Sequence, residues 1–271
     1  MPELPEVETT RRGIEAALVG KTVTAAVFHE RRLRWTVPRD FASSLHGQRV
    51  RAVKRRAKYL LVELERGTLI VHLGMSGSLR LMAPGRPRLT HDHVELLLDD
   101  GNVLRFNDPR RFGSMHFVIG DPLQHTLLAR LGPEPLGNDF DADYLWQVTR
   151  KRRAAIKQVL MSSHLVVGDG NIYASEALFR AGVRPGRAAG RLKRNEVEKL
   201  VAGIKAVLAA AIKAGGTTLR DYVNADGMPG YFRQKLYVYE RTGEPCRTCG
   251  TPIRHLQQGQ RSSYYCPTCQ T

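Results

Sequence analysis

The four cysteines near the C-terminus constrain the fold of this chain more than any other feature. They form two pairs, Cys246-x-x-Cys249 and Cys266-x-x-Cys269, and the chain has no other cysteine. Two closely spaced pairs let two turns converge on one ion, so the spacing predicts one structural, tetrahedral Zn²⁺ site with four thiolate ligands. Two disulfides are the alternative, which we do not expect in a cytoplasmic chain.

The charge balance points to a polyanionic partner. Lysine and arginine total 42 against 26 acidic residues, so the chain of 271 residues has a formal charge of +16. This excess favours nucleic acid, because an anionic membrane would be bound through a basic amphipathic helix and none stands out. No stretch approaches the roughly 20 apolar residues of a membrane span, and the N-terminus lacks the apolar core of a signal peptide. We therefore expect a cytoplasmic protein with no membrane partner.

A segment rich in glycine and proline, residues 131–137, divides the chain into a strand-rich part and a helical part. After one helix over 5–18, β-branched and apolar runs predict strands at 22–28, 59–64, 68–73, 94–98 and 103–106. The first part is therefore predicted to be a β-sandwich or barrel with an N-terminal helix. In the second part, apolar spacing predicts helices over about 153–161, from about 171, and over 197–212.

The N-terminus suits an amine nucleophile. Removal of Met1 would expose the secondary amine of Pro2, and an α-amino group with a pKa of about 7.7 to 8.0 is partly neutral at neutral pH. Its adduct with a sugar aldehyde is an iminium with no proton to lose from nitrogen, which suits a lyase. Glu3 and Glu6 fit proton transfer beside this amine, but acidic residues are also ordinary helix caps, and composition alone favours capping.

The residues between the cysteine pairs include Arg254, Arg261 and Tyr264. They suit a β-hairpin that lays a basic edge on a phosphate backbone. A purely structural role for this hairpin is the other interpretation, and both stay open here.

Together with several longer motifs, these residues resemble the formamidopyrimidine-DNA glycosylase family, also called 8-oxoguanine DNA glycosylases, over the whole chain. The matching stretches are PELPEVETTRR, RRAKYLL, HLGMSGSLR, HDHV, NDPRRFG, GNIYASEALF, GGTTLRDYVNADGMPGYF and the terminal CPTCQ. The resemblance implies an α+β multidomain chain. Its parts would be an N-terminal β-sandwich with an N-terminal helix (1–132), a helix-two-turn-helix DNA-binding domain (133–236) and a zinc-finger β-hairpin (237–271).

Carried to the matching positions, the family's catalytic roles describe a bifunctional DNA glycosylase and AP lyase of base excision repair. The resemblance implies that Pro2 attacks C1′ and displaces an oxidised purine, 8-oxoguanine or a formamidopyrimidine, with Glu3 as general acid and base. Lys58 is the implied proton donor in β-elimination and Arg261 in δ-elimination. The implied partner is double-stranded DNA with oxidised purines or abasic sites, and we expect a monomer.

A further set of residues is implied to contact the DNA. It comprises Glu6, Met75, His91, Arg110, Phe112, Arg152 and Asn171. A flipped-out nucleotide leaves a gap in the base stack, which Met75, Arg110 and Phe112 are expected to fill. Without the resemblance, core packing would be the interpretation of Met75 and Phe112. Residues 215–232 are expected to form a lid over the extruded base.

Two other functions stay open. A sister enzyme of the endonuclease VIII type would share the proline chemistry but prefer oxidised pyrimidines, and Leu4 and the Arg110/Phe112 pair argue against it. A zinc-containing DNA-binding protein without catalysis would leave Pro2 and Lys58 unexplained.

The chain departs from the family pattern at Asp169, where a small apolar residue is usual. Asn171 is expected to begin a helix whose free N–H groups receive a phosphate. The Asp169 carboxylate is therefore expected to weaken DNA binding or to cap this helix.

Overall fold

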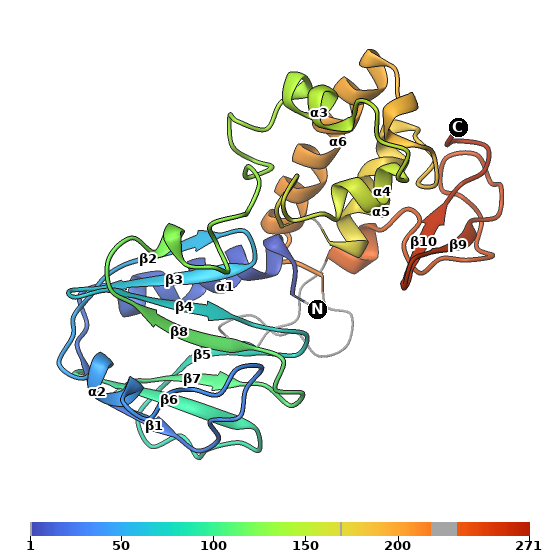
Figure 1. Ribbon diagram of the computed structural model, residues 1–271. Coiled ribbons are helices and arrows are strands. Elements are labelled where there is room, and N and C mark those ends of the chain that lie inside the picture. The colour runs from blue at the N-terminus through green and yellow to red at the C-terminus, as the bar shows by residue number, and fades with distance from the viewer. Residues whose placement is uncertain (1, 169, 218–231) are drawn as a thin grey trace. The chain divides into compact units, whose positions relative to one another are not determined.

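The computed structural model describes residues 2–168, 170–217 and 232–271, which form two compact units (Figure 1). The first unit contains the residues up to 129 and the segment from 214, and the second contains residues 130–213 and 232–271. The expectations for Met1, for Asp169 and for most of the lid over 215–232 lie outside the described residues.

Two antiparallel sheets of four strands build the first unit, in the orders β1-β6-β7-β5 and β2-β3-β4-β8. The strands are β1 (Val23–Phe28), β2 (Val50–Arg56), β3 (Tyr59–Leu64), β4 (Thr68–His72), β5 (Ser78–Met82), β6 (Asp92–Leu98), β7 (Val103–Asn107) and β8 (Ser114–Val118). Figure 1 shows the sheets as two layers, and their inward residues share one core. The predicted β-sandwich is confirmed.

Helix α1 (Leu4–Leu18) completes this core. Its buried residues Leu4, Val7, Ile14 and Leu18 follow a helical stripe, and Gly20 beyond its end has a φ of 87°. A short helix, α2 (Phe41–Leu45), packs near β1.

Strands β2, β5 and β8 are absent from the sequence predictions. In β2 the buried residues Val50 and Val53 are three positions apart, because a bulge between Val50 and Ala52 shifts the register with β3. Four basic side chains in this strand further mask the alternation that would reveal it.

The second unit contains α3 (Ala142–Thr149), α4 (Ile156–Leu160), α5 (Asn171–Ala181) and α6 (Arg194–Lys213). The helix predicted over 153–161 is shorter than expected. Ala155 instead forms a β-bridge with Ala188, and the Arg152 carbonyl accepts the N–H of Gly190 at 2.9 Å, so this segment is held outside the helix.

A hairpin of β9 (Arg254–Gln258) and β10 (Arg261–Tyr265) lies beside these helices within the same unit (Figure 1). The buried Gln270 joins the two parts, since its Nε2 donates to the Val183 carbonyl and its Oε1 accepts the Cys266 N–H.

Candidate active site

The predicted nucleophile lies at the start of α1. Pro2 is buried, and Glu3 is the N-cap residue. Glu3 and Glu6 form a reciprocal capping box, in which Glu6 Oε2 accepts the Glu3 N–H at 2.8 Å. The capping interpretation is therefore confirmed, and it places two buried carboxylates at the start of α1, directly after Pro2.

The second oxygen of Glu6 reaches a distant part of the first unit. Its Oε1 accepts the N–H of Thr217 at 2.7 Å. Gly216 has a φ of 82°, and a Cβ there would lie 2.9 Å from Glu6 Oε1, so this approach requires glycine. These contacts fix the Glu6 side chain at the N-terminus, and its expected contact with DNA stays a prediction.

Lys58 belongs to the two-residue turn between β2 and β3, with Ala57 at a φ of 54°. Burial, followed by the charges of Lys58 and Arg34, lowers the pKa of His72 to about 4. His72 is therefore neutral at neutral pH, and its Nδ1 accepts the N–H of Gly74 at 3.1 Å. The turn that carries Lys58 therefore lies beside His72, which accepts a hydrogen bond from the loop after β4.

Met75 and Phe112 lie on neighbouring loops of the first unit. A Cβ at Gly74 would lie 2.4 Å from backbone atoms of Phe112 and Gly113, so the two loops meet backbone to backbone. Met75 is 39% exposed and Phe112 is 43% exposed, so core packing is wrong for both. The Arg110 guanidinium lies 4.9 Å from the centroid of the Phe112 ring.

Asp108 forms hydrogen bonds with both of these loops. Its buried carboxylate accepts the Ser76 hydroxyl and the Gly113 N–H, each at 2.7 Å. The Ser76 oxygen in turn accepts the Arg110 N–H at 3.3 Å. The Asp108 N–H donates to the carbonyl of His91, an exposed residue with a φ of 73°. The Asp108 carboxylate therefore joins the loops that carry Met75, Arg110 and Phe112, and its backbone N–H joins them to His91.

In the second unit, Asn171 begins α5 and is held by a buried lysine. Lys157 Nζ donates to Asn171 Oδ1 at 2.7 Å, to the Ser262 carbonyl at 2.8 Å and to Ser263 Oγ at 3.0 Å. Asn171 Nδ2 donates to the Tyr239 hydroxyl at 3.4 Å. Lys157 thereby connects the start of α5 with strand β10, which Arg261 begins.

Arg261 and Arg152 are both exposed residues of the second unit. The Arg152 guanidinium donates to the Val148 carbonyl. Sequence reasoning missed Asp108, Lys157 and His72 as supporting residues. Asp108 lies inside the quoted NDPRRFG motif, but its burial and its partners are tertiary properties.

The cysteine cluster fits one zinc ion. The four Sγ atoms of Cys246, Cys249, Cys266 and Cys269 lie within 4.8 Å of one another, and two of the separations are 3.9 and 3.5 Å. A tetrahedral Zn²⁺ with Zn–S bonds of about 2.3 Å requires separations near 3.8 Å. All four cysteines are free thiols rather than disulfides. They would hold the ion, which fixes the two cysteine turns and the base of the hairpin.

Family comparisons match three consecutive segments of the chain. Residues 1–115 match the formamidopyrimidine-DNA glycosylase N-terminal domain, residues 131–223 the H2TH domain of the same enzyme, and residues 243–271 a zinc finger found in FPG and IleRS. The formamidopyrimidine-DNA glycosylase of Thioalkalivibrio sulfidiphilus is 61% identical over 100% of both chains.

Solved structures of the Lactococcus lactis enzyme are also similar to this chain. Its complex with DNA containing an abasic site has a TM-score of 0.93 and 35% identity, with 99% of each chain covered. The complex of a mutant with DNA containing Fapy-dG has a TM-score of 0.93 and 34% identity over 100% of both chains.

The fold, the cysteine cluster and these matches define a DNA-repair glycosylase with a zinc finger. The chain belongs to the formamidopyrimidine-DNA glycosylase family. Among the described residues, no helix is both long and apolar enough to span a membrane.

Proposed function

We propose that this chain excises oxidised purines, 8-oxoguanine and formamidopyrimidines, and then cleaves the strand by β,δ-elimination through a Schiff base on Pro2. The placement of Pro2 beside the buried Glu3 and Glu6 at the start of α1 carries this proposal. The Lactococcus lactis complexes with Fapy-dG DNA and with abasic DNA support the substrate class.

In the first step the Pro2 amine attacks C1′, and the electrons of the glycosidic bond leave with the base, which takes up a proton. Glu3 acts as the general acid and base that opens the sugar ring to an iminium. The Glu6 bond to the Glu3 N–H fixes the geometry of the pair.

Strand cleavage follows from the iminium. Loss of the C2′ proton releases the 3′ phosphate with Lys58 as proton donor, and a second elimination releases the 5′ phosphate with Arg261 as donor. His91, Arg110, Arg152 and Asn171 hold the DNA, and Met75 and Phe112 fill the vacated stack. The exposure of Met75 and Phe112 supports the last assignment.

Borohydride trapping on a duplex with one abasic site tests the proposal. The wild-type chain, shown by mass spectrometry to begin at Pro2, is expected to give a covalent protein–DNA adduct. The matched control is the same chain with one residue retained before Pro2. It is expected to bind the duplex but to lose trapping, base excision and strand cleavage. Normal turnover by the extended chain would refute the proline mechanism.

The lesion class needs a separate measurement. Relative kcat/KM values on duplexes that carry 8-oxoguanine or an oxidised pyrimidine distinguish the proposed enzyme from the endonuclease VIII type. Preference for the oxidised purine is expected, and preference for the pyrimidine would overturn the substrate assignment while leaving the proline chemistry intact.

A further inference from the structure

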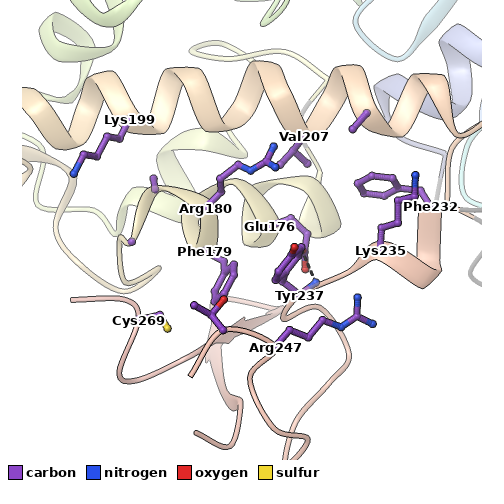
Figure 2. Close-up of a pocket in the computed structure, with 14 residues that line it drawn as sticks. Glu176, Phe179, Arg180, Lys199, Val207, Phe232, Lys235, Tyr237, Arg247 and Cys269 are labelled. Carbon is purple, nitrogen blue, oxygen red and sulfur yellow. Dashed lines mark hydrogen bonds between the residues drawn. The ribbon is translucent and has the colours of Figure 1, made fainter. Parts of the chain in front are cut away.

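A cavity lies within the second unit. Its lining residues are not among the predicted DNA contacts. It has a volume of about 800 Å³, within the roughly 300–1,000 Å³ typical of small-molecule sites. Figure 2 shows its walls, which come from the last turns of α5, from α6, from the segment around Lys235 and Tyr237, and from the first cysteine turn of the finger.

Four basic side chains line this cavity, namely Arg180, Lys199, Lys235 and Arg247 (Figure 2). Within the part of the chain that the structure describes, Arg180, Lys199 and Lys235 make no ion pair and no side-chain hydrogen bond. The cavity therefore gathers positive charge that the described residues do not neutralise, which favours an anionic ligand.

The one carboxylate in the wall does not offset these cations. Glu176 is buried, and its oxygens accept the backbone N–H groups of Tyr237, Val238 and Tyr239 at 2.8 to 2.9 Å. These bonds point the carboxylate at the backbone (Figure 2) and fix the segment that carries Tyr237.

An aromatic wall stands beside the cations. The rings of Phe179 and Tyr237 stack with centroids 5.3 Å apart and an interplanar angle of 26°. Tyr237 is 41% exposed, and the Arg247 guanidinium lies 5.8 Å from its ring centroid. Val207 from α6 adds an apolar surface. A large exposed aromatic beside basic groups is the combination with which proteins bind the bases and phosphates of nucleotides.

We propose that this cavity binds a nucleoside phosphate, with the phosphate at Arg180 and Lys235 and the base against the Phe179–Tyr237 wall. The cavity is separate from the predicted phosphate site at Asn171, because Arg180 is nine residues further along α5, about 13 Å at 1.5 Å per residue. The inference does not depend on the proposed glycosylase chemistry. The ligand is either a free nucleotide or the phosphorylated end of a nucleic-acid strand, which present the same chemistry.

Isothermal titration of the full-length zinc-loaded protein with adenosine 5′-monophosphate tests the proposal. One site is expected, with tighter binding than for adenosine or inorganic phosphate alone. Arg180→Glu should weaken the binding by about tenfold, the effect of one to two unit charges at contact distance in a water-like dielectric. Arg191→Glu is the matched control, because Arg191 is an exposed arginine of the same unit that does not line the cavity.

Lys235→Glu, at another exposed position that lines the cavity, provides a second variant should Arg180→Glu fail to fold by circular dichroism. Competition with a 5′-phosphorylated single-stranded tetranucleotide distinguishes the two sources. Displacement of the nucleotide assigns the cavity to strand ends, and no displacement assigns it to free nucleotides. Absence of nucleotide binding, or equal weakening by Arg180→Glu and Arg191→Glu, would overturn the proposal, since the latter would reflect net charge alone.

Discussion

Removal of the Asp108 carboxylate tests whether one buried group organises the exposed loops of the first unit. Asp108→Ala leaves two buried donors, the Gly113 N–H and the Ser76 hydroxyl, without their acceptor. Each buried donor left without an acceptor costs about 1–3 kcal/mol, and the hydroxyl can turn to another acceptor. The free energy of unfolding is therefore expected to fall by about 2–4 kcal/mol. Asp108→Asn keeps an acceptor for Gly113 and offers its amide to the Ser76 oxygen, so its expected loss is about 1 kcal/mol.

Thermal unfolding of the first unit measures these losses. The fluorescence of Trp35 in a Trp146→Phe background reports on this unit, because Trp146 belongs to α3 in the other unit. At roughly 3 °C per kcal/mol, the midpoint should fall by about 6–12 °C for Asp108→Ala and about 3 °C for Asp108→Asn. Asp121→Ala is the control, because it removes an exposed carboxylate whose two hydrogen bonds, from the Leu123 N–H and the Gln124 side chain, are open to water.

The same variants should separate base excision from strand cleavage. In single-turnover assays, Asp108→Ala should slow excision from a duplex more than cleavage at an abasic site in single-stranded DNA, because only the duplex requires the Met75 and Phe112 loops. Equal midpoints for Asp108→Ala and Asp108→Asn, or a loss no larger than that of Asp121→Ala, would refute the role assigned to Asp108.

The remaining predictions concern zinc, the wedge and pH. Cys249→Ser should reduce the zinc content from one ion to none and weaken DNA binding, because the ion supplies the folding energy of the finger; active protein without zinc by metal analysis would contradict this. Phe112→Ala should impair excision in duplex DNA more than cleavage at an unpaired abasic site, and equal losses would argue against a wedge. The lowered pKa of His72 means that the unfolded chain binds more protons between about pH 6.5 and 4, so stability should fall as the pH drops through this window, by about 3 kcal/mol in all. Denaturation at pH 7 and pH 4 should show a smaller difference in His72→Gln, and an unchanged difference would refute this origin.

Local sequence patterns were sufficient to predict those features that depend on residues close together in the sequence. The cysteine spacing determined the metal cluster, because two ligands three positions apart on a tight turn converge on an ion in almost any surrounding fold. The α6 helix followed from apolar spacing, and strands β1, β3, β4, β6 and β7 followed from β-branched and apolar runs. The amine chemistry of Pro2 could be argued from the residue itself, whereas the role of Lys58 came only from the resemblance, since lysine is ordinary elsewhere.

Only the tertiary structure decided which groups support these residues. Ser76 and Asp108 are 32 positions apart, Lys157 and Ser263 are 106 apart, and Glu6 and Thr217 are 211 apart. No local period encodes such pairs, because a buried side chain finds its partner among whichever backbone groups the packed sheets and helices bring to it. The cavity beside Tyr237 has the same origin, because its cations come from α5, α6, the segment at Lys235 and the finger, and only folding places them around one cavity.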